Sequence, residues 1–162
     1  MEQAQNYRDS GPIKKVEGDN EFYYILNESG GTAGKGIPYV LNMNAAATTI
    51  GGVSVVVAQY SVQAPATLAT SSSIICVPVA DIANGAWGWV QTKGYVPYAV
   101  TTGTVAANDQ LEVLNTGVAF IDQGTNGGAA IGANSCGIAL VLVTTDVWTI
   151  YLFGLQVVVA AA

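Results

Sequence analysis

The chain has 162 residues, enough for one domain with a core of its own, and it contains no histidine. Histidine is the usual general base, metal ligand and triad partner, so its absence argues against most classes of enzyme. The formal net charge is −6, and Lys14 and Lys15 are the only adjacent basic residues, which argues against a surface that binds nucleic acid. We therefore expect a binding or structural protein with no catalytic residue, no metal and no cofactor.

Charge and glycine content together indicate the fold class. The chain holds 5 basic and 11 acidic residues; 10 of these 16 precede Gly36, and none lies between Ile37 and Ala80. Nineteen glycines among abundant valine, threonine and alanine are typical of short strands and tight turns. No convincing amphipathic helix interrupts them. The sequence therefore predicts an all-β protein of about nine or ten strands, a single small β-barrel or β-sandwich domain.

The N-terminal segment differs from the rest. Residues 1–20 are polar and without periodicity, which predicts an extended arm ahead of a β-rich domain over residues 21–162. The arm carries side chains suited to docking on an acidic or aromatic surface, namely Tyr7, Arg8, Lys14 and Lys15. A frayed terminus without a role is the alternative. No apolar stretch of a secretory signal is present, so we expect synthesis and use in a cytoplasm.

The first half of the domain is predicted to contain a hairpin and a buried strand. Phe22–Leu26 is a predicted strand, closed by the glycine-rich turn Asn27–Gly36 and answered by a second strand over Pro38–Met43. The turn is not a phosphate-binding loop, because no serine or threonine follows Lys35. The valine-rich segment from Val53 is apolar on both faces, which predicts a central strand.

The middle of the chain alternates loop and strand. Residues 63–73 are small, polar and proline-bearing, which indicates a loop on one rim. The run IICVPVADI then predicts a short strand, with one helical turn over Ala80–Asn84 as an option. Cys76 and Cys136 each lie in an apolar run, which favours buried free thiols, with a disulfide as the alternative.

The clearest strand begins at Trp87. Trp87, Trp89, Gln91 and Lys93 share one parity, the period of two that marks a half-buried strand. For the two tryptophans we favour packing in the core or at an interface, because aromatic side chains dominate buried contacts. The alternative is that they stack on a sugar ring together with Tyr95.

A polar turn follows this strand. It spans Ala106–Asp109, and Asn108 suits it because asparagine tolerates left-handed backbone angles. Strand character resumes at Leu111 and Val113. Asp109 and Glu112 are the nearest pair of carboxylates in the body, but acids beside a turn are normally solvated, so catalysis there is not expected.

The C-terminal part combines a loop, two strands and a tail. A glycine-rich loop is predicted over Asp122–Ala130, and strands over Gly137–Val143 and Val147–Phe153. The charge-free stretch Val147–Ala162 is only 16 residues long and contains Thr149, Gly154 and Gln156, so a membrane span, which needs about twenty apolar residues, is not expected. The tail Leu155–Ala162 is instead predicted to be a strand. The tail contains three consecutive β-branched residues, Val157, Val158 and Val159, and no charge or proline that would block pairing with another strand. We therefore expect a strand that pairs outside its own subunit or with a protected edge of its own sheet.

Two groups of oxygen-bearing side chains could bind calcium. The first group is Glu17, Asp19, Asn20 and Glu21, and the second is Asp122, Gly124 and Asn126. Neither has the full spacing of a known calcium loop, so solvated turns are expected at both.

Several of these motifs resemble one family. The strand GAWGWVQ, the turn TVAANDQL and the glycine-led strand CGIALVLV are similar to the small decoration (cement) proteins of tailed-phage capsids, and NESGGTAGKGIPYVLN is similar to their glycine-rich first hairpin. The likeness covers roughly residues 27–153. Asn108 stands where the pattern usually has glycine, a substitution that such a turn accepts. The final LQVVVAAA has no counterpart in the pattern.

The resemblance implies a role and partners. It implies a homo-oligomer, a trimer, that binds the outer surface of the phage head through the major capsid protein and stabilises contacts between capsomers in the virion. The low charge of the body independently suits a surface covered by other subunits. Candidate capsid or subunit contacts are Tyr7, Arg8, Lys14, Lys15, Trp87, Trp89, Val157, Val158 and Val159. A carbohydrate- or receptor-binding module of a phage fibre is the alternative function.

Overall fold

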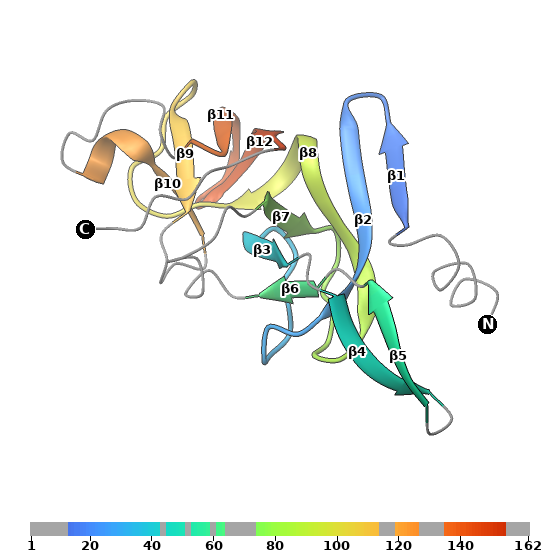
Figure 1. The fold of residues 1–162 in the computed structure, drawn as a ribbon. Coiled ribbons are helices and arrows are strands. Elements are labelled where there is room, and N and C mark those ends of the chain that lie inside the picture. The colour runs from blue at the N-terminus through green and yellow to red at the C-terminus, as the bar shows by residue number, and fades with distance from the viewer. Residues whose placement is uncertain are drawn as a thin grey trace.

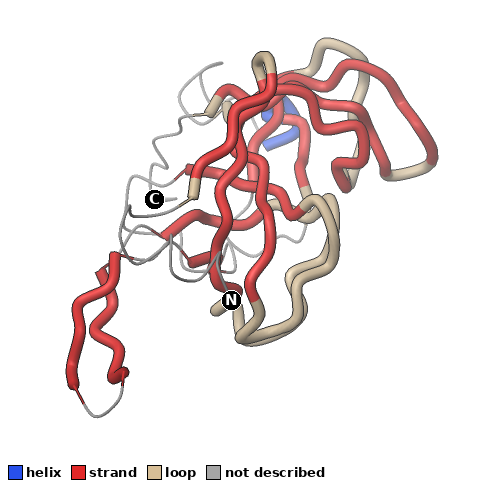
Figure 2. The backbone as a smooth tube through the Cα atoms, turned by 90° about the vertical axis from the view of Figure 1, so that its right-hand side faces the viewer, coloured by secondary structure: helices blue, strands red, loops and turns tan. Residues whose placement is uncertain are grey.

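The computed structural model describes residues 13–42, 45–50, 53–58, 61–63, 74–113, 119–126 and 135–154 of the chain. Over these residues the protein is all-β, which confirms the predicted fold class (Figure 1). Strands joined by loops make up most of the described chain, and the short 3-10 helix η2 (Gln123–Asn126) is drawn in blue in Figure 2. No helix in the described part of the chain is long and apolar enough to cross a membrane.

Twelve strands are present in the described residues, more than the nine or ten predicted. The first six are β1 (Lys14–Glu17), β2 (Asn20–Asn27), β3 (Tyr39–Asn42), β4 (Ala45–Ile50), β5 (Val53–Ala58) and β6 (Ser61–Gln63). The last six are β7 (Ile74–Pro78), β8 (Trp87–Val100), β9 (Gln110–Val113), β10 (Phe120–Asp122), β11 (Gly137–Thr144) and β12 (Val147–Phe153). Ten of them form one sheet in the order β1-β2-β6-β3-β7-β8-β12-β11-β9-β10, and β4 and β5 form a separate pair.

The 14-residue strand β8 belongs to two circuits of strand pairing. In the first, β8 pairs with β2 and β7, and β6 and β3 connect those two strands. In the second, β8 pairs with β12, followed by β11, β9 and β10, and a bridge from Phe120 back to Thr101 completes the circuit. Neither circuit is a regular barrel, because β2 and β6 share two residue pairs and the second circuit is completed by a single bridge.

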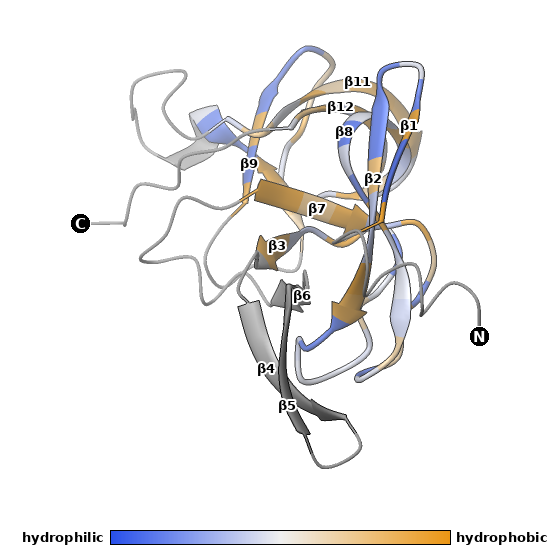
Figure 3. Cartoon of the chain, turned by 45° about the vertical axis from the view of Figure 1, so that its right-hand side comes forward, coloured by the Kyte–Doolittle hydropathy of each residue, from blue (hydrophilic) through white to orange (hydrophobic). Residues whose placement is uncertain are grey.

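Each circuit has a hydrophobic cluster. The first cluster is Ile25, Ala33, Tyr39, Leu41, Cys76, Ile82 and Val90. The second is Val40, Ile75, Val77, Val96, Ala99, Leu111, Phe120, Cys136, Ala139, Trp148, Ile150 and Leu152. Figure 3 shows β3 and β7 as apolar strands, and both contribute to each cluster. Removing a side chain such as Ile25 or Phe120 from water contributes about 1.5–3 kcal/mol, so these clusters are the main source of stability.

Strand β8 changes partners at Gly94. Residues 87–93 pair with β2, and residues 93–100 pair with β12. Gly94 has a φ of 91°, a left-handed conformation that glycine adopts without strain. The Asn20 Oδ1 accepts from the backbone N–H of Tyr95 at 2.8 Å, so the β1–β2 turn holds this point of β8 in place.

The N-terminal arm is shorter than the sequence predicts. Residues 14–17 of the expected arm form β1, which pairs with β2 through a turn containing Gly18. All four β1 residues are exposed, so the strand lacks the apolar alternation by which a half-buried strand is recognised. Residues 1–12 lie outside the described part of the chain.

Two predicted strand positions are wrong. β3 does not form a hairpin with β2; it pairs with β6 and β7, because β6, from later in the chain, lies between β2 and β3. The valine-rich β5 is not a central strand, since it pairs with β4 in a separate two-stranded sheet (Figure 1). Periodicity identifies a strand, but it does not identify the strand's neighbours.

The segment after β7 also differs from one expectation. No helical turn forms over Ala80–Asn84; Ile82 instead makes an isolated bridge with Ala33. The preceding prediction for Cys76 and Cys136 is confirmed, because both are buried free thiols. Burial raises the pKa of each thiol, since a thiolate would lose its hydration there.

Candidate interaction surface

The two predicted tryptophans lie on the surface of the sheet, one on either side of a tyrosine. In the β2–β8 register Tyr24 is opposite Trp89, and Leu26 is opposite Trp87. The ring of Tyr24 is stacked 5.9 Å from that of Trp87 and tilted 5.2 Å from that of Trp89. Trp87 is 39% exposed, and neither tryptophan belongs to a buried cluster. Trp87 is exposed and Trp89 is half-buried, and an interface role for both stays a prediction.

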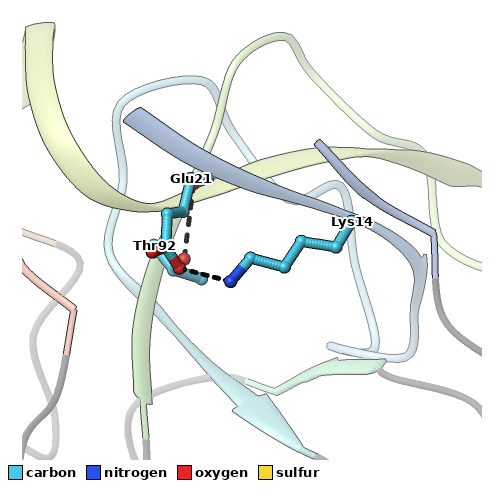
Figure 4. Close-up of polar contacts among 3 residues, drawn as sticks. All are labelled: Lys14, Glu21 and Thr92. Atoms are coloured by element: carbon cyan, nitrogen blue, oxygen red, sulfur yellow. Dashed lines mark hydrogen bonds and ion pairs between the residues drawn. The ribbon is translucent and has the colours of Figure 1, made fainter. Parts of the chain in front are cut away.

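The two adjacent lysines of the edge strand β1 form different ion pairs, one with β2 and one within β1. Lys14 Nζ lies 2.8 Å from a carboxylate oxygen of Glu21, and Figure 4 shows that Thr92 of β8 reaches the same residue. This hydrogen bond to Glu21 raises the pKa of Lys14. Lys15 pairs with Glu17 at 2.6 Å.

These lysines also lie over aromatic rings. Lys14 Nζ is 5.6 Å from the ring centroid of Tyr23, and Lys15 Nζ is 6.0 Å from that of Phe22. Exposed contacts of this kind contribute little to stability, and their main effect is orientation. A charged edge strand also resists pairing with other chains, so the surface at β1 favours polar docking over sheet extension.

A second group of rings lies on the other half of β8. Tyr95 is directly opposite Tyr151 of β12, and their rings meet edge to face at 5.4 Å. Phe153 follows on the same face, 6.4 Å from Tyr151. Tyr95, a candidate for sugar stacking together with Trp87 and Trp89, has its ring contact with Tyr151 instead. The parity of Tyr151 and Phe153 in the run WTIYLF was the signal that could have identified this group.

The turn after β8 has the conformation expected of it. Asn108 has a φ of 73°, which confirms the prediction of a left-handed residue at this position. A carboxylate oxygen of Asp109 accepts from the N–H of Ala106 at 2.6 Å, which closes the turn. The N–H of Asn108 then donates to Ala139 O at 2.8 Å, and the N–H of Ala139 donates to Asp109 O at 2.9 Å. The turn is thereby fixed to the glycine-led strand β11.

The acidic groups considered for calcium make other contacts. Glu17 and Glu21 each pair with a lysine, and the Asp122 Oδ1 accepts from the N–H of Gly124 at 3.0 Å. Among the residues that the structure describes, no group of three histidine, cysteine or acidic side chains could hold a metal ion.

The glycine-rich loop before β3 packs against the body. The N–H of Lys35 donates to Asp81 at 2.8 Å, and Lys35 Nζ lies 4.6 Å from the ring centroid of Tyr98. Gly36 is close enough to β8 that a Cβ there would meet the Tyr98 carbonyl oxygen. These contacts hold the loop against the body of the protein. They agree with the sequence, which lacks the residue spacing of a phosphate-binding loop.

Comparison with known proteins gives one structural likeness. No protein-family model matches the chain, and no curated protein matches it. A solved structure of the N base of the head fiber gp8.5 of bacteriophage phi29 is similar, with a TM-score of 0.48 and 8% sequence identity. The likeness covers 84% of this chain and 96% of that one. At this level the likeness does not establish a shared fold.

The remaining candidate residues lie outside the described part of the chain. They are Tyr7, Arg8, Val157, Val158 and Val159. The predicted tail strand over Leu155–Ala162 lies outside it as well. Of the nine candidates, the structure therefore positions Lys14, Lys15, Trp87 and Trp89, and it places all four on the β1–β2–β8 part of the sheet.

Proposed function

We propose that the protein is a structural component of a tailed-phage virion, a decoration subunit that binds the outer surface of the head and stabilises contacts between capsomers. Its partner would be the major capsid protein, and its role would not be enzymatic. The proposal follows the sequence resemblance, whose separate motifs can be examined in the structure for mutual contact.

The observation that carries the proposal is the contact between two of these motifs. The turn of TVAANDQL and the strand of CGIALVLV are about thirty residues apart in sequence, yet the turn exchanges two backbone hydrogen bonds with Ala139 of that strand. Cys136 also donates from its N–H to Leu111 O at 2.8 Å. Motifs that form one structural unit are better support for a family resemblance than motifs that are merely present in order.

The β1–β2–β8 surface is the proposed capsid-binding face. Lys15 lies over Phe22 on the face that carries Tyr24, Trp87 and Trp89, whereas the adjacent Lys14 points to the opposite face. A row of aromatic side chains beside a cation is a composition enriched in protein interfaces. Lys15 pairs with Glu17, which favours one orientation of its side chain before a partner arrives. This reduces the entropy that binding must overcome.

Cosedimentation with expanded empty capsids tests the function. We expect the purified protein to pellet with capsids assembled from its cognate major capsid protein, and to stay in solution without them. Replacing Lys15 by alanine should weaken capsid binding by up to about tenfold, since rim charges contribute modestly to affinity. The matched control is Lys35→Ala, a lysine over Tyr98 on another surface. Failure of the wild-type protein to bind such capsids would exclude the decoration role.

A carbohydrate-binding module is the second candidate, favoured by the exposure of Trp87 beside Tyr24 and Trp89. Flat aromatic groups can stack on sugar rings. Titration with glycans should then shift the fluorescence of Trp87 and Trp89, while the buried Trp148 serves as an internal reference. A Trp87→Ala variant should lose the response. An unchanged wild-type spectrum across a panel of glycans would exclude this candidate.

A further inference from the structure

The sequence contains two Asn-Gly pairs, Asn84–Gly85 and Asn126–Gly127, and the structure describes both residues of the first pair. Asparagine followed by glycine is prone to spontaneous deamidation, because glycine has no side chain that hinders attack of its nitrogen on the preceding amide. Asn84 and Gly85 are both exposed, in the turn between the bridge at Ile82 and the start of β8. Water, which completes the reaction, therefore reaches this pair.

Deamidation proceeds in two steps that need no enzyme. The backbone nitrogen of Gly85 loses its proton to solvent base and attacks Cγ of Asn84, which forms a C–N bond and closes a succinimide ring. The side-chain nitrogen of Asn84 takes up a proton and leaves as ammonia. Water then adds to either carbonyl of the ring and opens it, which gives aspartate or isoaspartate. In isoaspartate the backbone runs through the side-chain Cβ and is longer by one methylene group.

The fold restrains the attacking nitrogen. The N–H of Gly85 donates to Asn27 O at 2.8 Å, and the N–H of Asn27 donates to Ala86 O at 2.9 Å. The N–H of Ala86 donates to Ala83 O at 3.0 Å and closes the turn. Gly85 has a φ of 76°, a conformation that suits glycine at the third position of a turn. The Gly85 nitrogen can therefore lose its proton only after the bond to Asn27 has broken.

The buried side chain of Asn27 opposes this opening. Its Nδ2 donates to Ile82 O at 2.7 Å, directly before the turn. The side chain of Asn84 adds little, because its Oδ1 accepts one long bond, from the N–H of Gly30 at 3.3 Å. Residues 83–86 belong to no strand, so their bonds can break while the strand pairs of β8 stay intact. Opening of the turn is therefore a local event that costs less than global unfolding.

We propose that Asn84 is a site of spontaneous deamidation, and that the opening of the Ala83–Ala86 turn sets its rate. Closed copies are protected because the N–H of Gly85 stays bonded to Asn27, and open copies react at the rate of an unfolded chain. The inference concerns the covalent ageing of the protein in solution and does not rest on the proposed function.

The product alters the candidate surface. The longer isoaspartate backbone moves Gly85 relative to Asn27, so the two backbone bonds that join Asn27 to the turn do not re-form together. Trp87 follows the turn directly and stacks on Tyr24, so modification at Asn84 displaces one end of the aromatic row. Copies with a closed turn keep the row intact.

Mass spectrometry of the full-length protein after incubation in mildly alkaline buffer tests the proposal. In urea, Asn84 and Asn126 should be modified at similar rates, because both precede glycine. In the folded protein, modification of Asn84 should be at least about tenfold slower than in urea. Hydrogen exchange of the Gly85 amide should be slowed by the same factor, because both processes require release of the same nitrogen.

Two variants separate local opening from global stability. Asn27→Ala should speed modification of Asn84 and exchange at Gly85 together, by at least about fivefold, since it removes a buried hydrogen bond that holds the turn. The matched control is Asn108→Val, which strains the second circuit without a contact to this turn and should leave both rates unchanged. The wild-type comparison needs no variant, so the proposal stays testable if Asn27→Ala fails to fold.

The effect of the product has its own measurement. Protein modified at Asn84 carries an additional negative charge and can be separated by ion exchange. Its Gly85 amide should exchange at close to the rate of an unfolded chain. The proposal is overturned by equal rates for Asn84 in folded and unfolded protein, by a slowing that differs from the protection of Gly85, by equal effects of the two variants, or by a protected Gly85 in the isoaspartate product. None of these measurements uses a capsid, so this inference and the proposed function can fail separately.

Discussion

The Nδ2 of Asn27 donates a hydrogen bond to the carbonyl oxygen of Ile82 at 2.7 Å, between two buried residues that are 55 positions apart. The same amide donates to Gly31 O at 2.8 Å, and its Oδ1 accepts from the N–H of Ser29 at 2.9 Å. One side chain therefore satisfies the backbone of two loops that pack at the end of the first cluster.

Replacing Asn27 by alanine should lower the free energy of unfolding by about 1–3 kcal/mol, because buried backbone groups would lose their partners. The loss of unfolding free energy is measured by urea denaturation, with tryptophan fluorescence as the signal. The control is Asn84→Ala, since Asn84 is exposed and accepts one long bond from Gly30 at 3.3 Å. Equal losses in the two variants would mean that burial of Asn27 does not matter.

A methyl group at Gly94 should be poorly tolerated. A Cβ there would lie 2.1 Å from Asn20 Oδ1 and 2.9 Å from the carbonyl oxygen of Asp19. Gly103 has a similar positive φ of 77° but open space around it. We expect Gly103→Ala to cost about 1–2 kcal/mol from backbone conformation alone, and Gly94→Ala at least about 2 kcal/mol more from the clash. Thermal melts of the two variants give the difference, and similar melting temperatures would contradict the close approach.

Substitutions at Asn108 should change stability through the backbone conformation that they favour and not through the polarity of the side chain. Asn108→Gly should change stability by less than about 0.5 kcal/mol, whereas Asn108→Val should cost about 1–3 kcal/mol, because a β-branched residue disfavours positive φ. Ala107→Val is the control, since Ala107 is exposed in the same turn without a positive φ. Chemical denaturation distinguishes the three variants. A stable valine at position 108 would refute the left-handed assignment.

The two buried thiols should make the protein less stable in alkali. Burial raises the pKa of Cys76 and Cys136 in the folded state, so above about pH 8.5 the unfolded chain releases protons that the folded chain retains. Their contribution is fully present below that pH, and each thiol should remove about 1.4 kcal/mol per pH unit above it.

Unfolding free energies measured from pH 8 to 10.5 test this dependence. Cys76→Ala and Cys136→Ala should each reduce the slope against pH, whatever their effect on absolute stability. A disulfide-forming reagent should also leave both thiols unmodified until the protein unfolds. An unchanged slope in both variants would show that other groups cause the alkaline loss.

Local features of the fold could be predicted from the sequence, whereas strand neighbours could not. The β11–β12 pair and the Asn108 turn follow from alternation and turn chemistry, which act within a few residues. The separation of β3 from β2 depends on β6, which enters from later in the chain. Such long-range pairing leaves no periodic mark on either partner.

The candidate surface could also be predicted only in part from the sequence. Trp87 and Trp89 were identified from their parity, but Tyr24, which lies between them, belongs to another strand and is brought there by register. The exposed Val141 and Leu142 have the composition of a core strand, so the sequence alone marks them as buried. They differ from buried valine and leucine elsewhere because the end of β11 extends past the core, so no other element in the described part of the chain covers these side chains.

The sharing of β8 between two circuits has a consequence for synthesis on the ribosome. Every residue of the first cluster precedes residue 91, whereas the second cluster needs residues up to Leu152. The first cluster can therefore form while the C-terminal third of the chain is still being translated. Strand β8 is then already in place, and β12 pairs with it afterwards. The two thiols would report this order. In stalled nascent chains, Cys76 should become protected from alkylation at shorter chain lengths than Cys136.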